Sequence, residues 1–177
     1  MESKPDNEIK TEAAIGFGSN VGERMSHLRE ALARLRELDS VALLCKSGVY
    51  ETEPVDVLEE FADMPFLNAV AVFETSLGVE EWSAVVHAIE DAMLRVRGTV
   101  SHTPRTIDLD LLYFGDMVIN RPHLHIPHPQ ISLRRFVCEP LAELRPEMTL
   151  PGQSKTIRQI LATLPTEPTV RRVGEFA

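Results

Sequence analysis

The order of its predicted strands and helices constrains the fold of this chain more than any other feature of the sequence. Four apolar, β-prone runs are typical of strands, and two segments with apolar residues at helical spacing are typical of amphipathic helices. The strands are expected at residues 13–18, 41–51, 66–74 and 106–114, and the helices at 23–38 and 79–96. The order along the chain is therefore strand, helix, strand, strand, helix, strand.

This order is that of the split βαβ arrangement, a ferredoxin-like α+β fold in which helices cover one face of an antiparallel sheet. The sequence predicts one such domain over residues 13–164. Its C-terminal extension is expected to hold two short helices, near 134–144 and 156–164. Residues 1–12 are polar and are expected to form a disordered lead-in. Residues 165–177 have so little pattern that we expect them to form a tail.

The composition fits a single soluble globular domain: the chain has 177 residues, of which 44% are hydrophobic and 25% are charged. No apolar run approaches the length of a membrane span, and no signal-peptide pattern is present. We therefore expect a cytoplasmic protein without a membrane partner, and a monomer. Cys45 and Cys138 lie in apolar surroundings and are expected to be reduced thiols.

The distribution of charge points to a small anionic ligand. A net charge of −9 argues against a general nucleic-acid binder. Between residues 95 and 135, however, six arginines outnumber three acids. A basic patch on an acidic protein suits a compact anion such as a nucleotide. The alternative is that these arginines pair with the acidic remainder of the chain.

Asp108 and Asp110 form an Asp-x-Asp pair in the fourth predicted strand. Residues two apart in a strand project from the same face, and adjacent carboxylates repel unless a cation lies between them. Mg²⁺ is the usual cation, since it binds one or two carboxylates together with waters and substrate phosphates. Arg105 could hold a phosphate nearby by bidentate hydrogen bonds. Taken alone, the pair also fits a strand end whose carboxylates meet solvent or arginine.

Six ordered segments together carry a more specific signal. They are IGFGSN at 15–20, YETEP at 50–54, FLNAV at 66–70, IE at 89–90 with RVR at 95–97, PRTIDLD at 104–110, and IPHP at 126–129 followed by RRFV at 134–137. In these segments the chain resembles the 6-hydroxymethyl-7,8-dihydropterin pyrophosphokinase family of folate biosynthesis. The resemblance covers residues 13–164, and it implies a Mg²⁺-dependent diphosphotransferase.

The resemblance implies transfer of the β,γ-pyrophosphoryl group of ATP to the hydroxymethyl group of the reduced pterin, leaving AMP. It also implies roles for individual residues. Asp108 and Asp110 match the aspartates that bind two Mg²⁺ ions, and Arg95 and Arg105 match arginines that act on the transferring phosphates. Nucleotide or phosphate contacts are implied for Glu90, Arg97, His128 and Arg134, and pterin contacts for Thr52, Val55, Phe66, Asn68 and Phe136.

Side-chain chemistry supports some of these roles and leaves alternatives for others. A pterin is apolar on its faces and polar at its edge, which suits the ring of Phe136 and the amide of Asn68. Without the resemblance, Phe66 and Phe136 would be assigned to the core, His128 to a loop and Glu90 to a solvated helix face.

The segment before Pro104 departs from the family pattern. Ser101 and Thr103 stand where the family usually has a basic residue and a glycine. Loss of the cation and of the glycine's backbone freedom is expected to make the 98–103 loop close less favourably on ATP. A homologue that binds nucleotide or pterin without turnover is therefore one alternative. A ferredoxin-like ligand-sensing module is another, although it would have no need for the paired aspartates.

Overall fold

The computed structural model describes residues 9–54, 63–93 and 106–176. The elements within these ranges are β1 (Thr11–Ser19), α1 (Arg24–Arg36), β2 (Val41–Lys46), β3 (Gly48–Thr52), β4 (Phe66–Thr75), α2 (Val79–Ala92), β5 (Asp108–Phe114), β6 (Ile119–Arg121), β7 (Leu124–Ile126), the short 3₁₀ helix η2 (Pro129–Ser132), α3 (Arg135–Leu144), α4 (Ile157–Thr163) and β8 (Val170–Glu175). The residues expected to form a disordered lead-in begin outside the described ranges, but residues 11 and 12 already belong to β1.

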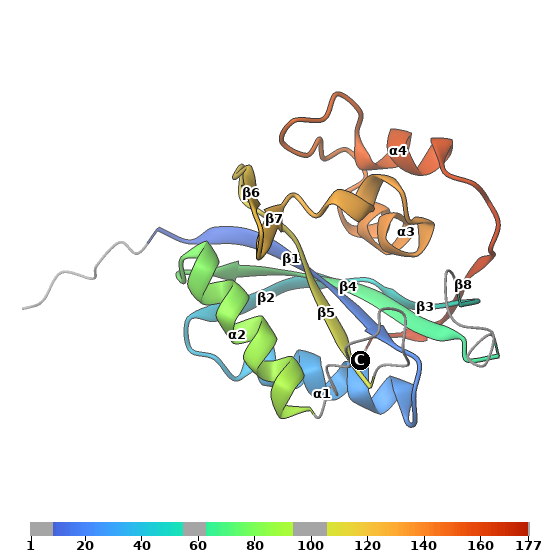
Figure 1. The fold of residues 1–177 in the computed structure, drawn as a ribbon, viewed down its shortest axis with the longest axis horizontal. Coiled ribbons are helices and arrows are strands. Elements are labelled where there is room, and N and C mark those ends of the chain that lie inside the picture. The colour runs from blue at the N-terminus through green and yellow to red at the C-terminus, as the bar shows by residue number, and fades with distance from the viewer. Residues whose placement is uncertain (1–8, 55–62, 94–105, 177) are drawn as a thin grey trace, which may run out of the picture.

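The main sheet has the strand order β5-β1-β4-β3-β8, and β2 also pairs with β4 (Figure 1). All these pairings are antiparallel. The order of β5, β1, β4 and the β2–β3 segment is the one that a split βαβ arrangement produces. In it the first and third of the four predicted strands lie in the centre, and the second and fourth lie outside them. The expected ferredoxin-like α+β fold is therefore confirmed.

The single strand expected over 41–51 is in fact two strands, β2 and β3, separated at Ser47. Both pair with β4, with Lys46 opposite Ala71 and Tyr50 opposite Asn68. Ser47 stays attached at the break: its N–H donates to the Val70 carbonyl at 2.9 Å, and its hydroxyl accepts from the Val70 N–H at 3.0 Å. The Ser47 hydroxyl thus takes the place of a backbone acceptor in the sheet. Such a side-chain substitute leaves no pattern in the sequence, so the break between the two strands was not predicted.

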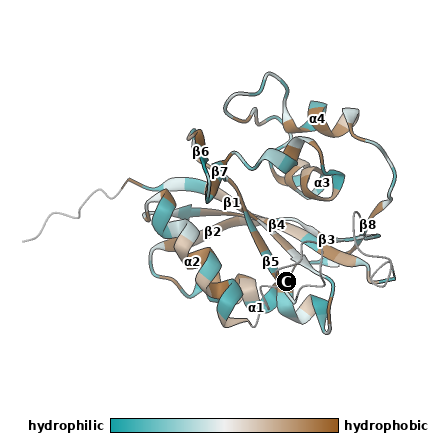
Figure 2. Cartoon of the chain, viewed as in Figure 1, coloured by the Kyte–Doolittle hydropathy of each residue, from teal (hydrophilic) through white to brown (hydrophobic). Residues whose placement is uncertain are grey.

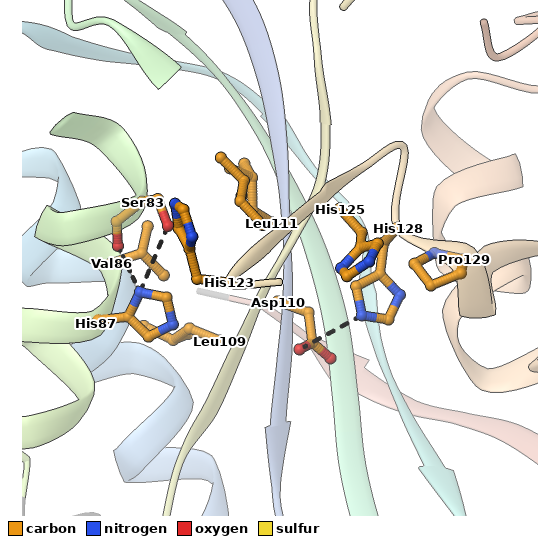
Figure 3. Close-up of a pocket in the computed structure, with 11 residues that line it drawn as sticks. Ser83, Val86, His87, Leu109, Asp110, Leu111, His123, His125, His128 and Pro129 are labelled. Carbon is orange, nitrogen blue, oxygen red and sulfur yellow. Dashed lines mark hydrogen bonds and ion pairs between the residues drawn. The ribbon is translucent and has the colours of Figure 1, made fainter. Parts of the chain in front are cut away.

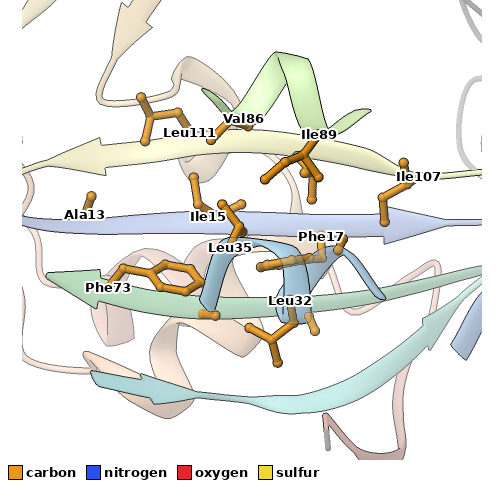
Figure 4. Close-up of a cluster of buried hydrophobic side chains, with 14 of the residues drawn as sticks. Ala13, Ile15, Phe17, Leu32, Leu35, Phe73, Val86, Ile89, Ile107 and Leu111 are labelled. Carbon is orange, nitrogen blue, oxygen red and sulfur yellow. The ribbon is translucent and has the colours of Figure 1, made fainter. Parts of the chain in front are cut away.

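Helices cover both faces of the sheet rather than the one face expected. In Figure 1, α1 and α2 lie below the sheet, and α3 and α4 lie above it. Ile15 and Phe17 of β1 face α1 and α2 (Figure 4), whereas Ala14 packs with Val70 and Leu141 on the side of α3. The central strands are apolar at both alternating positions, so both of their faces must be covered. The predicted C-terminal helices exist, and they supply the second layer.

The helices show the amphipathic pattern on which their prediction rested. Figure 2 shows polar and apolar stretches alternating along α2. Its apolar side contributes Trp82, Val86 and Ile89 to the core, and Trp82 lies 5.8 Å from Phe73 between ring centroids. Among the described residues, no helix has both the length and the apolar character needed to cross a membrane.

The segment after Pro165 contains a strand where the sequence predicts no element. β8 pairs antiparallel with β3, with Arg172 opposite Tyr50, and forms one edge of the sheet. The next residue, Phe176, is 1% exposed and packs edge-on against Phe17 at 4.9 Å between centroids. Most of β8 is exposed, so its sequence lacks the apolar alternation that marks a half-buried strand.

Neither cysteine forms a disulfide. Cys138 is fully buried, and burial raises the pKa of its thiol to about 11, so the thiol stays protonated. Cys45 is half-buried beside Arg145, whose Nη1 lies 3.3 Å from Sγ.

Candidate functional site

The two aspartates lie on β5, the edge strand next to β1. Asp108 is opposite Gly18 and Asp110 is opposite Gly16, so both carboxylates are on the side of the sheet that faces α3. Between them, Leu109 is buried against the α1–α2 side. The strand geometry expected for the Asp-x-Asp pair is therefore present.

A row of residues crosses the sheet from the first aspartate. Gly18 is opposite Asp108 on one side and opposite Asn68 on the other, and Asn68 is in turn opposite Tyr50. Asp108 and Asn68 are two strands apart, which is about 10 Å. A Cβ atom on Gly18 would lie 3.5 Å from the Asn68 Oδ1 and 3.7 Å from the Asp108 Cβ. Glycine therefore leaves an open floor between an amide and a carboxylate.

Glu90 reaches the same strand from α2. Its side chain is fully buried, and its Oε1 accepts a hydrogen bond of 2.8 Å from the Leu109 N–H. Since β5 is an edge strand, this carboxylate satisfies a backbone donor that has no strand beside it. The contact fixes the part of β5 that lies between the two aspartates. Glu90 is not on a solvated helix face, and the nucleotide contact implied for it stays a prediction.

His128 approaches Asp110 from the segment that precedes η2. Its Nε2 lies 3.9 Å from the Asp110 Oδ1 (Figure 3). Its Nδ1 accepts from the Gln130 N–H at 3.2 Å. Because Nδ1 accepts, Nε2 carries the proton of the neutral ring and points toward the carboxylate. Burial, followed by the nearby Arg134, lowers the pKa of His128, and Asp108 partly opposes this. His128 is therefore a neutral hydrogen-bond donor at neutral pH.

A cavity of about 210 Å³ opens beside Asp110, between α2, β5 and the β7 segment. It is lined by Ser83, Val86, His87, Leu109, Asp110, Leu111, His123, Leu124, His125, His128 and Pro129 (Figure 3). Four of these residues are histidines and four are valine or leucine. Apolar walls with a few polar groups suit a flat heteroaromatic ring.

His87 is a lining residue that the sequence analysis did not single out. Its Nδ1 lies 2.8 Å from the Ser83 carbonyl oxygen, which can only accept, so Nδ1 carries the proton. The other ring nitrogen is then an acceptor in the neutral form. His123 and His125 also line this cavity. Their position on the β6–β7 hairpin, next to α2, depends on the tertiary structure.

Three of the residues expected to contact a pterin, Thr52, Phe66 and Asn68, lie beyond Gly18 on the same face of the sheet. The Asn68 Nδ2 donates to the Thr52 Oγ1 at 2.9 Å, and both side chains are almost fully buried. Phe66 is half-buried at the start of β4 and lies directly opposite Thr52. The side chain of Thr52 therefore holds the amide of Asn68 in place.

Phe136 and Arg134 lie together at the start of α3. The guanidinium carbon of Arg134 is 5.7 Å from the centroid of the Phe136 ring, a cation–π contact. Phe136 is half-buried and packs against the α3-side cluster, so it is not a fully buried core residue. Its role as a stacking surface stays a prediction.

Several expected site residues lie outside the described ranges. They are Val55, Arg95, Arg97 and Arg105. Ser101 and Thr103, which depart from the family pattern, also lie outside these ranges. Within the described residues, no group of three or more histidine, cysteine or acidic side chains is arranged to hold a metal. The donor set of Asp108 and Asp110 still fits Mg²⁺, which commonly binds one or two carboxylates and takes its other oxygens from water and phosphate.

Comparison with known proteins gives a consistent family. The sequence model described as 7,8-dihydro-6-hydroxymethylpterin-pyrophosphokinase (HPPK) matches residues 14–146, a range that includes every candidate site residue. A Pseudomonas aeruginosa 2-amino-4-hydroxy-6-hydroxymethyldihydropteridine pyrophosphokinase is 34% identical over 161 residues, covering 90% of this chain and 96% of the relative. The Bacillus subtilis protein of the same name is 39% identical over 132 residues, covering 75% and 77%.

Other relatives are longer than this chain. The folic acid synthesis protein fol1 of Schizosaccharomyces pombe is 33% identical over 156 residues, which cover 88% of this chain but 21% of that protein. A crystal structure of a Plasmodium falciparum HPPK-DHPS variant with pterin and p-hydroxybenzoate superposes with a TM-score of 0.69 at 16% identity. It covers 89% of this chain and 44% of that one. The chain thus spans about a fifth of the fungal relative and less than half of the solved structure.

Proposed function

Since the chain belongs to the 7,8-dihydro-6-hydroxymethylpterin-pyrophosphokinase family, we propose that it transfers pyrophosphate from ATP to 6-hydroxymethyl-7,8-dihydropterin. The products are AMP and the pterin diphosphate, an intermediate of folate biosynthesis. In this reaction the hydroxymethyl oxygen forms a bond to the β-phosphorus. The bond between that phosphorus and the oxygen bridging to the α-phosphate breaks, AMP leaves with that oxygen, and the hydroxyl proton is released.

One observation carries the proposal: the order of the groups in the site, first along β5 and then across the sheet. The cavity on the outer edge of β5 comes first, then Asp110 and Asp108, then the open floor at Gly18, and finally Asn68. This order matches the sequence of groups in the two substrates when they meet, namely base, phosphates, hydroxymethyl and pterin ring. Positioning of this kind dominates phosphoryl-type transfer, which needs little covalent chemistry from the protein.

The cavity next to Asp110 is proposed to take the nucleobase end of ATP. Its volume of about 210 Å³ suits a ring system rather than a whole nucleotide, so the phosphates would extend along β5 toward the aspartates. His128, with its Nε2–H turned toward Asp110, would donate to a phosphate oxygen held there. Arg134, which lies close enough to His128 to lower its pKa, would add positive charge.

Asp108 and Asp110 are proposed to hold the two Mg²⁺ ions. When bound, Mg²⁺ offsets the negative charge of the phosphates, and two carboxylates on one face of β5 supply suitable oxygen ligands. Glu90 would keep these ligands aligned, because it holds the Leu109 N–H between them. Arg95, Arg97 and Arg105 are proposed to act on the phosphates, as the family resemblance implies.

Asn68 is proposed to read the edge of the pterin. One of its two N–H donors goes to Thr52, and its carbonyl oxygen lies over the open floor at Gly18. An amide fixed in this way presents an acceptor in one orientation, which a flat ligand with donors along its edge can match. Phe136 would stack on the ring face, and Thr52, Val55 and Phe66 would line the same pocket.

An assay of nucleotide products tests the proposal. The purified chain is incubated with ATP, Mg²⁺ and 6-hydroxymethyl-7,8-dihydropterin, and we expect AMP and the pterin diphosphate to form in equal amounts. Release of ADP, or binding of both substrates without turnover, would contradict the proposed reaction. Omission of Mg²⁺ with a chelator present is expected to stop AMP release. The monomeric state and the cytoplasmic location stay predictions.

A further inference from the structure

Arg24, the first residue of α1, connects the two chain segments that carry the proposed pterin residues. Its Nη1 donates to the Pro65 carbonyl at 2.7 Å, and its Nη2 donates to the Glu51 Oε2 at 3.2 Å. Pro65 directly precedes Phe66, and Glu51 directly precedes Thr52. One guanidinium therefore joins the end of β3 to the start of β4.

This contact lies on the other side of the sheet from the pterin residues. Glu51 is opposite Leu67, a core residue on the side of α1, whereas Thr52, Phe66 and Asn68 are on alternate positions and face α3. Arg24 therefore has no route to direct contact with a pterin bound over Asn68. Any effect of Arg24 on the pterin residues must therefore pass through the backbone of the two strand ends.

The charge arrangement around Glu51 strengthens this junction. Its second oxygen, Oε1, accepts from the Arg171 Nη2 of β8 at 2.9 Å. The side chains of Arg24 and Glu51 are 28% and 25% exposed, while that of Arg171 is 70% exposed. The Arg24–Glu51 pair is partly shielded from water and the Arg171 pair is not, so Arg24 is the partner that matters more.

Local helix energetics do not explain an arginine at this position. A cation in the first turn of a helix is unfavourable because the helix dipole is positive there. No acidic residue lies in the first turn of α1. The compensation comes from Glu51 and the Pro65 carbonyl, both far from Arg24 in sequence. The planar fork of an arginine presents two separated N–H groups to two acceptors in a fixed geometry, whereas a lysine offers one compact charge on a flexible stem.

We propose that Arg24 is a positioning residue for the pterin site. By closing the junction between Glu51 and Pro65, it keeps the last pair of the β3–β4 ladder, Thr52 and Phe66, in place, and with it the orientation that Thr52 gives to the Asn68 amide. This inference rests on the proposed function, because it assigns to Arg24 a role toward the pterin and none toward ATP.

The test compares Arg24→Gln and Arg24→Lys with Arg34→Gln. Arg34 is a matched control: it lies on the same helix and pairs with Glu30 at 2.7 Å, but the pair is exposed and remote from the site. For Arg24→Gln we expect KM for the pterin to rise about tenfold, which corresponds to about 1.4 kcal/mol. KM for ATP and the melting temperature are expected to stay near wild-type values. Arg24→Lys should recover part of the loss, and Arg34→Gln should match wild type.

Two results would overturn the inference. One is an unchanged KM for the pterin in Arg24→Gln; the other is an equal loss for pterin and ATP together with a lower melting temperature, which would indicate a general structural role. Failure of the proposed function is recognised separately, because in that case the wild-type chain itself would not release AMP with the pterin.

Discussion

At the scale of single residues, the site depends as much on what Gly18 lacks as on what its neighbours carry. Its backbone lies in β1 between Asp108 and Asn68, and its missing side chain leaves the space between them open. The nearby glycine of the same strand, Gly16, has a different neighbour, since a Cβ there would stand 3.4 Å from the apolar side chain of Leu112. Gly18 is therefore the glycine of this strand whose open side lies between two polar residues of the candidate site.

Gly18→Ala is expected to impair turnover while the fold stays as stable as wild type. The added methyl would stand at ordinary contact distances of 3.5 Å from Asn68 and 3.7 Å from Asp108, so it fills the floor without a severe clash. We expect kcat/KM to fall by about tenfold or more. Gly174→Ala is the control, since the nearest atom to its Cβ is the Met25 Cε at 3.8 Å. Equal activity of the two variants would show that nothing binds over Gly18.

Asp108→Asn and Asp110→Asn are each expected to slow AMP release at saturating Mg²⁺. The loss of transition-state stabilisation should be on the order of 2.7–4 kcal/mol. Each change removes one negative charge from the proposed metal ligands but keeps the size and polarity of the side chain. Thermal unfolding followed by circular dichroism should be almost unchanged. Asp116→Asn makes the same charge change at an exposed position just after β5 and should behave as wild type. Wild-type rates in both site variants would reject the metal assignment.

At the scale of elements, β8 is a strand that its own sequence does not reveal. It is largely exposed and charged, and its pairing with β3 and the burial of the adjacent Phe176 help to hold it in the sheet. It also brings Arg171 to Glu51, close to the junction that Arg24 closes. The last strand of the fold is therefore connected to the end of β3 that carries Thr52.

Phe176→Ala is expected to lower the free energy of unfolding by about 3 kcal/mol, the size usual for removing a buried aromatic ring. The ring is 1% exposed and packs edge-on against Phe17 in the α1-side core. Val173→Ala, in the same strand at 40% exposure, should cost far less. Urea unfolding of both variants measures the difference. Similar small losses would mean that Phe176 is not what anchors β8.

At the scale of the whole molecule, a polar cluster joins β1 to the C-terminal end of α3. Glu12 of β1 accepts hydrogen bonds from the Tyr113 hydroxyl at 2.6 Å and from the Arg145 Nε and Nη2 at 3.1 and 2.8 Å. Glu12 and Arg145 are 133 residues apart in sequence. The cluster therefore closes the sheet against its second helix layer.

Glu12→Gln is expected to destabilise the protein by about 1 kcal/mol at pH 7. The hydrogen bonds from Arg145 lower the pKa of Glu12, with a smaller contribution from Tyr113, while burial opposes them. A carboxyl whose folded-state pKa is depressed contributes its full stability above its ordinary value of 4.5, and loses it as the pH falls through the lowered value. The difference in free energy of unfolding between wild type and variant should therefore shrink as the pH is lowered from 4.5 through the depressed pKa of Glu12.

Urea unfolding at pH 7 and at successively lower pH measures this difference. Glu74→Gln is the control, because it removes the charge of a more exposed glutamate, which pairs with Lys10 at 3.1 Å. It is expected to have little effect on the free energy of unfolding at any pH. A constant difference between wild type and Glu12→Gln across this range would contradict the role assigned to the charge.

The sequence by itself determined the split βαβ order, the positions of α1, α2, β4 and β5, and the shared face of Asp108 and Asp110. These features depend on local periodicity, which is 3.6 residues in a helix and two in a strand, and local periodicity is written directly in the chain. The family resemblance also indicated His128 beside the phosphates and Asn68 at the pterin edge. The structure gives both residues surroundings that suit those roles.

Only the tertiary structure decided the features that depend on contacts between distant segments. The division of the predicted strand at Ser47, the packing of α3 and α4 on the second face, and the strand β8 all depend on partners far away in sequence. The cavity wall made by His87 and His123 brings α2 next to the β6–β7 hairpin. The junction at Arg24 likewise joins three segments that no local pattern connects. Pairing and burial between remote segments carry no period along the chain, so they become visible only when the chain is folded.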